Sequence, residues 1–498
     1  MKIVLGYPSL EDPRGFIQVG QNRQSKIFSV GEEAAIFPCV MAWAATMLKR
    51  AGHEVVWQDG PTEGLSWAHQ FRRLQEARPD LVCWEVKTPS ALRAYAAVTT
   101  LKQALPGTIV VLVGDHVTAL PEEALIACPV DFVVTGGDYD FAVAHLVKQL
   151  AAGYWPERWT NDGPWQNPHR GIIHWPTDAK LETLPTIDRV LCHWKDYSRM
   201  GNYLYRPGTH GYSARDCWWR SGGGCTFCSW TNTFKNYRQL SVDQFMADVE
   251  SAHALGAREY FDDAGTWAPP GPWAAEGLRR LRHFNLGYRH QRARMAMGCN
   301  DRPGARGAKA YREMAGAGFR FILYGLESAN LDTLQRINKG QKAEDMRNAA
   351  KWASEAGLQP HLTTMFGYSH ESLADAENTI VLIRELFDKG WANSMQATLL
   401  MPYPGTRLFK DCDEQGLLRT KDWSLYTMNQ PVIKCPMTDG QVLGCIRRAY
   451  KAAATPKYVL RKIITIRTKD DFRFLWRGLR FWAGHLKDFS TRALTHPH

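Results

Sequence analysis

The first third of the chain alternates between short apolar runs and longer amphipathic segments. This alternation predicts parallel strands connected by helices, as in a doubly wound α/β sheet. Open sheets of this kind bind ligands beyond the carboxyl ends of their strands, where loops meet the first turns of helices. The predicted strands cover residues 3–5, 54–57, 80–86, 108–113 and 131–134, and the predicted helices cover residues 34–51 and 91–105.

The same alternation resumes after residue 240 and predicts a partial or full barrel with its site at the carboxyl ends of the strands. The predicted strands cover residues 259–263, 320–324, 361–366 and 395–400, and the predicted helices cover residues 242–255 and 346–356. Five candidate residues stand at the strand ends: Asp262, Asp263, Glu327, Gly367 and Tyr403. Each has an ordinary alternative as a helix cap, a surface ion-pair partner or part of a turn.

An apolar stripe at helical spacing marks the C-terminal region. It consists of Phe472, Leu475, Leu479, Trp482 and Leu486, with arginines beside it. We expect this stripe to dock on the barrel. The alternative is contact with an anionic membrane surface, or capture of an acidic or lipidic substrate.

Composition adds limits on class and compartment. The 498 residues predict roughly two to four domains, and 45% hydrophobic and 22% charged residues are ordinary for a globular protein. The net charge of +11 is concentrated in residues 447–498, which hold thirteen Lys or Arg and three Asp, so we expect no nucleic-acid partner. Eleven scattered cysteines, the lack of a signal-peptide pattern and the lack of a long apolar run favour a cytoplasmic protein with reduced thiols.

Three cysteines in one glycine-rich loop carry the strongest chemical signal. Cys217, Cys225 and Cys228 lie within thirteen residues that include three consecutive glycines. Three thiolates suit an iron–sulfur cluster with one iron left open for a ligand, whereas structural zinc prefers four protein ligands. The alternatives are three reduced cysteines near a turn, or a Cys3His zinc site that uses His210.

This loop resembles the CxxxCxxC signature of the radical S-adenosylmethionine (SAM) superfamily. Cys225-Thr226-Phe227-Cys228 keeps the second half of that signature, including the aromatic residue before the last cysteine. The first spacer departs from it, because seven residues rather than three separate Cys217 from Cys225. The resemblance implies that the three cysteines hold a 4Fe-4S cluster that binds and reductively cleaves SAM.

The first domain is similar to the cobalamin-binding domain that precedes the barrel in one radical SAM group. Residues 114–123 resemble that group's G-x-H-x-T-x-L-P-E-E stretch, and residues 131–137 resemble its next strand and glycine-rich turn. The DxHxxG motif of other cobalamin proteins is absent, which implies a base-off cofactor without a histidine below the cobalt. The resemblance implies cobalamin contacts for Gly114, His116, Thr118, Leu120, Gly136 and Gly137.

The strand ends of the second half resemble the same family in order and spacing. Asp262-Asp263 occupies the position that commonly meets the SAM amino group, and residues 325–328 match a G-x-E-S strand end. Residues 365–368 stand where the family has a G-x-P-G-E turn, here without Pro or the second Gly, and residues 401–406 match a P-x-P-G-T turn. The resemblance implies cofactor contacts for Asp262, Asp263, Glu327 and Gly367, and catalytic roles for Tyr403 and Glu327.

The expected fold is therefore α/β, with a Rossmann-like cobalamin-binding domain, a radical SAM barrel that is partial or complete, and a small, mostly helical C-terminal region. The expected boundaries are 1–150 for the first domain, 151–195 for a connector, 196–420 for the barrel and 421–498 for the basic region.

The resemblance implies methyl transfer from SAM, via methylcobalamin, to an unactivated carbon or a phosphorus of a small-molecule or lipid-like substrate. An external electron donor such as flavodoxin or ferredoxin is the implied partner, and the basic C-terminal region suggests peripheral membrane contact. One alternative is oxidative ring formation, as in the anaerobic porphyrin-ester cyclases. An alternative of another class is a cobalamin- or metal-binding regulator without turnover, which would not need the strand-end residues.

Overall fold

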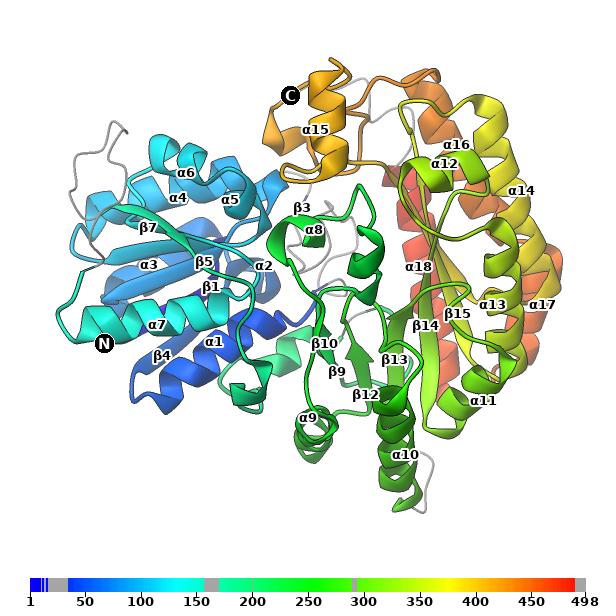
Figure 1. Cartoon of the computed structure of the whole chain (residues 1–498), viewed down its shortest axis with the longest axis horizontal. Helices are drawn as coiled ribbons and strands as arrows, with labels where there is room; N and C mark the ends of the chain where they lie inside the picture. Colours follow the sequence, from blue (N-terminus) through cyan, green and yellow to red (C-terminus); the bar gives the residue numbers. More distant parts are fainter. Residues whose placement is uncertain are drawn as a thin grey trace.

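Two parallel sheets form the centre of the protein, one in each half of the chain (Figure 1). The computed structural model describes residues 1–9, 11–12, 15–16, 35–155, 170–199, 201–288 and 293–488. Residue 34, at the start of one predicted helix, lies outside the described residues. Within the described part of the chain, no helix is both long and apolar enough to cross a bilayer.

The first sheet has six parallel strands and confirms the predicted doubly wound α/β domain. Its central strand β5 (Leu81–Glu85) is buried at every position, as expected for a strand covered by helices on both faces. Helix α1 (Cys39–Arg50), helix α4 (Ala91–Ala104) and helix α7 (Tyr139–Ala151) belong to its covering layers. The order is β4 (Glu54–Asp59), β1 (Lys2–Tyr7), β5, β6 (Ile109–Val113), β7 (Phe132–Thr135) and β8 (Gly171–His174).

Strand β8 adds a sixth strand to the first sheet. It lies within residues 151–195, which we expected to connect the domains, and it pairs in parallel with β7. The strand has four residues, too few for a hydrophobic period to be recognised, so its pairing partner defines it.

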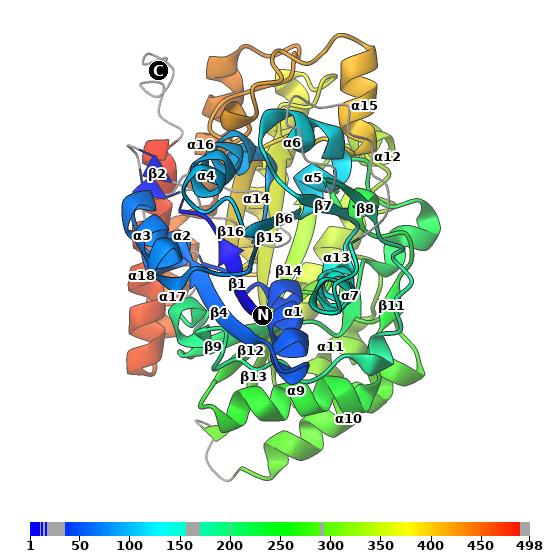
Figure 2. The ribbon, with the colours of Figure 1, turned by 90° about the vertical axis from the view of Figure 1, so that its left-hand side faces the viewer.

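The second sheet also has six parallel strands and forms a half-barrel, because its first and last strands do not pair with each other. Figure 2 shows the two sheets from the side. Helix α9 (Val242–Ala254) begins with a capping box between Ser241 and Gln244. The strand order is β16 (Ser394–Leu399), β15 (Gln359–Phe366), β14 (Phe319–Glu327), β13 (Ala296–Asp301), β12 (Glu259–Asp262) and β9 (Gly208–Gly211).

The helices of the half-barrel follow the predicted alternation. Helix α13 (Ala343–Glu355) is followed by Gly357 with a φ of 86°, as the predicted C-terminal glycine requires. The other helices are α10 (Pro272–Leu286), α11 (Ala308–Gly316), α12 (Leu331–Arg336), α14 (Leu373–Lys389) and α15 (Arg407–Glu414).

The C-terminal region is helical, as predicted, and comprises α16 (Asp439–Ala453), α17 (Pro456–Ile464) and α18 (Lys469–Asp488). The predicted apolar stripe of α18 splits between two environments. Leu475, Trp482 and Leu486 are half-buried, and the indole Nε1 of Trp482 donates to the carbonyl of Tyr450 at 3.1 Å. Phe472 and Leu479 are exposed, so the expected docking is correct for only part of the stripe.

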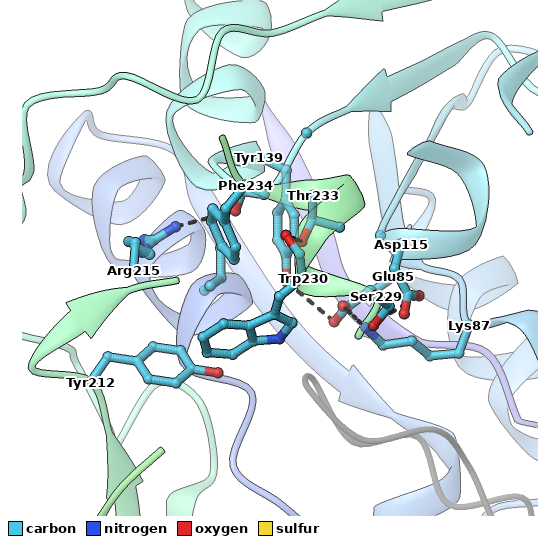
Figure 3. Close-up of a pocket in the computed structure, with 14 residues that line it drawn as sticks. Glu85, Lys87, Asp115, Tyr139, Tyr212, Arg215, Ser229, Trp230, Thr233 and Phe234 are labelled. Atoms are coloured by element: carbon cyan, nitrogen blue, oxygen red, sulfur yellow. Dashed lines mark hydrogen bonds and ion pairs between the residues drawn. The ribbon is translucent and has the colours of Figure 1, made fainter. Parts of the chain in front are cut away.

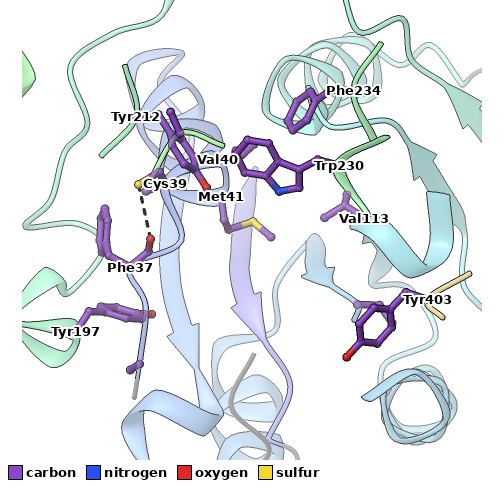
Figure 4. Packing of buried hydrophobic residues seen from close by; sticks show 14 of the residues in the cluster. Phe37, Cys39, Val40, Met41, Val113, Tyr197, Tyr212, Trp230, Phe234 and Tyr403 are labelled. Carbon is purple, nitrogen blue, oxygen red and sulfur yellow. Dashed lines mark hydrogen bonds between the residues drawn. The ribbon is translucent and has the colours of Figure 1, made fainter. Parts of the chain in front are cut away.

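One continuous core joins the two halves (Figure 4). Trp43 of α1 stacks on Tyr212 with ring centroids 6.1 Å apart, and the guanidinium of Arg215 lies 5.0 Å from the Trp43 ring. Trp57 Nε1 donates to the hydroxyl of Tyr197 at 3.0 Å. The two halves are therefore held in a fixed relation, so a site can be built from both.

Candidate functional site

The cysteine loop is closed at its neck by a short antiparallel pair, β10 (Ala214–Arg215) and β11 (Arg238–Gln239). Both arginines of this pair reach carboxylates at the start of α7. Arg238 donates to both oxygens of Asp138, at 2.7 and 2.9 Å. Arg215 Nη2 lies 2.6 Å from Asp140 Oδ2, and its Nη1 lies 3.3 Å from Asp138 Oδ1. These buried ion pairs fix the cysteine loop to the first domain.

The seven-residue spacer between the first two cysteines is a folded turn. Residues Trp218–Gly222 form a short 3-10 helix, η5, directly after Cys217. Asp216 accepts two hydrogen bonds from Arg220, at 2.7 and 2.8 Å, which hold the turn closed. Gly223 and Gly224 have φ values of 88° and 69°, a region that disfavours other residues, and they return the chain to Cys225.

A second segment, the turn after α12, is hydrogen-bonded to the cysteine loop. The amide Nδ2 of Asn338 donates to the carbonyls of Gly222 and Gly224, at 2.7 and 2.8 Å. The indole of Trp219 donates back to the carbonyl of Asn338 at 2.8 Å. Sequence reasoning missed Asn338, because nothing in its local sequence indicates a partner more than a hundred residues away.

The three thiols lie near enough to one another to interact electrostatically. Burial, with a smaller contribution from the neighbouring Cys225, raises the pKa of Cys217 to about 11 and that of Cys228 to about 12. Arg302 lowers the pKa of Cys217, and it lies over the Trp219 ring at 4.3 Å. Cations beside grouped thiols are the environment that an anionic thiolate cluster needs.

The alternative of a Cys3His zinc site gains no support. Nδ1 of His210 lies 2.5 Å from the hydroxyl of Tyr203, within the barrel. Within the described residues, no group of three or more His, Cys, Asp or Glu side chains has the arrangement of a metal-ion site, and the three cysteines are no exception. A cluster binds each thiolate on a different iron, so its thiolates need not converge on one point. The donor set and the surrounding cations fit a cluster.

The predicted acidic pair at the end of β12 is buried. Asp262 accepts from the backbone N–H of Ser213 at 2.8 Å and from its hydroxyl at 2.5 Å. Burial raises the pKa of Asp262 to about 7. Asp263 accepts from the amide of Asn300 at 3.1 Å. Asp262 thus shapes the strand end, while a SAM contact for either residue stays a prediction.

Glu327 is connected to the cysteine loop through Lys339, and its cofactor and catalytic roles stay predictions. It ends β14 with a φ of 57° and lies 2.8 Å from Nζ of Lys339. Burial alone would lower the pKa of Lys339, but Glu327 and the Cys225 thiolate raise it. Lys339 therefore links the carboxylate at the strand end with the cysteines. Sequence reasoning missed Lys339.

Gly367 begins a turn in which Glu371 takes part. The backbone N–H of Gly367, whose φ is 92°, donates to Oε2 of Glu371 at 2.7 Å. Burial raises the pKa of Glu371 to about 7. Its Oε1 and the hydroxyl of Tyr368 have no hydrogen-bond partner among the described residues. Glu371 stands four residues after Gly367, where the G-x-P-G-E turn has its Glu, and the missing Pro and Gly concealed this.

In the first domain, Thr118 connects the two predicted cobalamin segments. Its hydroxyl donates to the carbonyl of Gly114 at 2.6 Å and accepts from the N–H of Gly136 at 3.1 Å. Gly114 has a φ of 112°, and a Cβ there would lie 2.7 Å from the carbonyl oxygen of Val86. The loops that follow β6 and β7 are thus hydrogen-bonded to each other through Thr118. We call these loops, with Gly114 and Gly136, the glycine-rich rim.

His116 is buried among protein groups. Its Nδ1 lies 3.2 Å from the hydroxyl of Thr88, and its Nε2 lies 3.3 Å from Oε1 of Glu123. Trp423 covers it edge to face at 5.5 Å and donates to both Glu123 oxygens at 3.0 Å. Leu120, half-buried, precedes helix α6 (Pro121–Ala127) on the same segment. Cobalamin contacts for both residues stay predictions.

The glycine-rich turn of the first domain touches the segment that follows Cys228. Helix α8 (Trp230–Thr233) begins two residues after this cysteine. The N–H of Gly137 donates to the carbonyl of Thr233 at 2.8 Å, and a Cβ on Gly137 would lie 2.2 Å from the ring of Phe234. Only glycine allows this approach, so the predicted cobalamin turn and the cysteine loop share one interface.

A cavity opens between these two segments (Figure 3). One wall comes from the strand ends of the first sheet, and the other comes from the residues around and after the cysteine loop. The first wall includes Glu85, Lys87, Gly114, Asp115, Gly136, Gly137 and Tyr139, and the second includes Tyr212, Arg215, Ser229, Trp230, Thr233 and Phe234.

A buried charged group lies in the first wall. Nζ of Lys87 lies 2.8 Å from Glu85 and 3.4 Å from Asp115, and Tyr139 donates to Glu85 at 3.2 Å. Burial alone would lower the pKa of Lys87, but the two carboxylates raise it, so this lysine stays protonated. Glycine backbone beside buried charge is suited to a cofactor with polar substituents, so the wall fits the predicted cobalamin.

Tyr403 lies at the same interface (Figure 4). Burial raises the pKa of its hydroxyl well above the usual value, and Asp115 and Tyr426 raise it further. The hydroxyl lies 3.5 Å from the carbonyl oxygen of Tyr426. A neutral phenol at this position can donate a hydrogen bond but does not act as an anion near neutral pH.

Comparison with known proteins identifies both domains that line this cavity. Residues 36–144 match the B12 binding domain, and residues 214–383 match the radical SAM superfamily. An uncharacterized methyltransferase of Pyrococcus horikoshii is 26% identical over 86% of this chain and 90% of its own. An anaerobic magnesium-protoporphyrin IX monomethyl ester cyclase of Cereibacter sphaeroides is 24% identical over 91% of this chain and 71% of its own.

A solved structure supports the fold. The radical S-adenosylmethionine methyltransferase TsrM from Kitasatospora setae, with cobalamin and a 4Fe-4S cluster bound, superposes over 99% of both chains with a TM-score of 0.65 and 14% identity. The chain thus combines a B12-binding domain over residues 36–144 with a radical SAM domain over residues 214–383. Its cofactors are accordingly a 4Fe-4S cluster, SAM and cobalamin.

Proposed function

We propose that the protein is a cobalamin-dependent radical SAM methyltransferase acting on a small-molecule or lipid-like substrate. The observation that carries this proposal is the cavity between the strand ends of the first sheet and the residues that follow Cys228. Methyl transfer through cobalamin needs one substrate position within reach of both cofactors. The cavity is lined by residues of both domains, so it marks the interface at which such a position would lie.

Three cysteines would hold the cluster, and the glycine-rich rim of the first domain would hold cobalamin. A cluster with an open iron supplies reductive cleavage of SAM, and cobalamin supplies a methyl carrier. Asp263, Glu327 and Gly367 would orient SAM at the strand ends. Asp262 would contribute by fixing Ser213 and the course of the loop, since its oxygens already accept hydrogen bonds.

Tyr403 and Lys87 would determine the access of water to the cavity and the arrangement of charged groups in its wall. Tyr403 is 5% exposed and closes the interface beside Asp115, so it would exclude water and donate a hydrogen bond. Lys87, held protonated, would fix the Glu85 and Asp115 carboxylates in place beside the bound cofactor. An external electron donor such as flavodoxin or ferredoxin would reduce the cluster. Peripheral membrane contact is a separate proposal that concerns α17 and α18.

Oxidative ring formation is the second candidate, because the cyclase relative aligns over 91% of this chain. The two reactions differ in the fate of the SAM methyl group. The test supplies methyl-deuterated SAM and a reductant to the reconstituted enzyme together with fractions of a small-molecule extract. A methyltransferase gives a product with the intact deuterated methyl group and releases both S-adenosylhomocysteine and 5′-deoxyadenosine. Release of 5′-deoxyadenosine with an unlabelled product would favour the cyclase.

A further inference from the structure

Helices α17 and α18 present large apolar side chains to solvent. Seven of them are between 45% and 59% exposed, and they lie within 21 consecutive residues. The described residues include sixteen large apolar side chains exposed to at least 38%, so nearly half are concentrated here. We call these seven the apolar face: Val459, Leu460, Ile463, Ile464, Phe472, Trp476 and Leu479.

The spacing of these residues assigns them to one side of each helix. Residues 459, 460, 463 and 464 share a side of α17, and residues 472, 476 and 479 share a side of α18. The linker between the helices is short, and Figure 2 places both helices at the left edge of the molecule. The apolar face is therefore a local feature of the surface, away from the cavity between the domains.

Docking on the barrel does not account for this face, because α18 docks through other residues. Nη2 of Arg477 donates to the carbonyl of Tyr203 at 2.5 Å, and Asp470 pairs with Arg258 at 3.1 Å. Phe474 lies under the guanidinium of Arg320 at 5.6 Å. Arg258 and Arg320 stand at the amino-terminal ends of β12 and β14, the ends opposite the predicted site.

Among the side chains that the structure describes on α17, α18 and the linker between them, every exposed charged one is basic. Lys457, Arg467, Lys469, Arg473 and Arg480 are exposed, whereas Asp470 and Asp471 are half-buried. Asp470 pairs with Arg258, and Asp471 accepts from the backbone and hydroxyl of Thr468. Cations around exposed aliphatic and aromatic side chains are the pattern of helices that lie in the headgroup region of a bilayer.

We infer that α17 and α18 bind the protein to the surface of an anionic lipid bilayer, with the apolar face inserted among the headgroups. The charge favours this occupant over a second copy of the chain, because symmetric pairing of this surface would bring like charges together. The inference goes beyond the proposed methyl transfer and does not depend on it, since the residues involved lie away from both cofactor segments.

The test is sedimentation of the full chain with lipid vesicles, without any substrate. We expect binding to vesicles that mix phosphatidylcholine and phosphatidylglycerol, little binding to pure phosphatidylcholine, and weakening with salt. Replacing Lys469, Arg473 and Arg480 by Gln should weaken binding about 100-fold, at about 1 kcal/mol for each basic residue near the surface. Phe472→Ser, Trp476→Ser and Leu479→Ser together should weaken it at least about tenfold.

The matched control removes exposed apolar side chains elsewhere. Ile126 and Val381 are 58% and 65% exposed, so Ile126→Ser with Val381→Ser should leave vesicle binding unchanged. Equal binding to both vesicle types, or binding that neither triple variant reduces, would overturn the inference. Dimers that form without lipid and are lost in the apolar variant would instead assign the face to a second copy. Binding that appears only after removal of residues 489–498 would show that the chain covers its own apolar face.

Discussion

At the residue scale, Asp138 joins the two domains. Its carboxylate is fully buried and accepts hydrogen bonds from Arg238 and Arg215, which lie on the two strands that close the cysteine loop. A buried carboxylate is stable only with such partners, because burial of an unpaired charge is very costly. The residue that follows the glycine-rich turn therefore determines where the cysteines stand relative to the first sheet.

Each cysteine of the loop should be required for the cluster. After anaerobic reconstitution we expect about four iron atoms per chain, and Cys217→Ala, Cys225→Ala and Cys228→Ala should each lose most of this iron and all SAM cleavage. Cys435→Ala is the control, since Cys435 is equally half-buried but lies outside the loop. Iron retained in Cys217→Ala would mean that the seven-residue spacer leads to a different ligand.

Asp262 should make stability depend on pH. Its pKa is about 7 in the folded protein and near 4 in the unfolded chain, because burial disfavours the carboxylate. Its contribution to stability is fully present below the unfolded pKa and is lost as pH rises through the folded value. Between pH 4 and 7, wild type should therefore lose stability relative to Asp262→Asn by about 3 kcal/mol, measured by urea unfolding of the protein without cofactors. A constant difference across this range would show that Asp262 is already ionised at low pH.

The residues that carry the chemistry of the site are easier to predict from the sequence than the residues that surround them. The three cysteines and Glu327 could be predicted because motif spacing is local. Lys339 and Asn338 could not, because they act on the cysteine loop from a distant turn. Lys87 was missed because a single lysine after a strand gives no signal until Glu85 and Asp115 are seen beside it.

At the element scale, the two sheets place their carboxyl-end loops against each other. Strands with strong apolar runs, such as β5 and β6, were predicted within a few residues. Strands β9 and β13 were not predicted, because Gly208–Gly211 and Ala296–Asp301 contain glycine and polar residues instead of an apolar run. Such strands are defined by their neighbours in the sheet, since pairing and burial override local propensity.

The contact between the glycine-rich turn and α8 should not tolerate a side chain. Gly137→Ala would place a Cβ 2.2 Å from the Phe234 ring, so the turn must move, and we expect at least about tenfold weaker hydroxocobalamin binding by spectroscopic titration. Adding Phe234→Ala should restore part of the affinity because it removes the clash. Gly107→Ala is the control, since nothing lies within 4 Å of a Cβ there. Unchanged affinity in Gly137→Ala would place the cofactor elsewhere.

At the scale of the whole molecule, the second domain and the C-terminal region both hold the first domain in position. Buried ion pairs fix the loop neck to α7, and Trp423 covers His116 and binds Glu123 from the far end of the chain. The domain order was predictable from the succession of motifs. The contact between Trp423 and Glu123 was not predictable, because the two residues are 300 positions apart in the sequence.

The central claim is that the cofactors of the two domains meet across one cavity. The most direct measurement supplies methyl-deuterated SAM to the reduced, cobalamin-loaded enzyme without substrate and then analyses the extracted cobalamin by mass spectrometry. We predict deuterated methyl on the cobalamin of the wild type, released with S-adenosylhomocysteine, and much less label in Gly137→Ala at equal cobalamin occupancy. Bound cobalamin that never acquires label, while 5′-deoxyadenosine is still released, would contradict methyl transfer between the two domains.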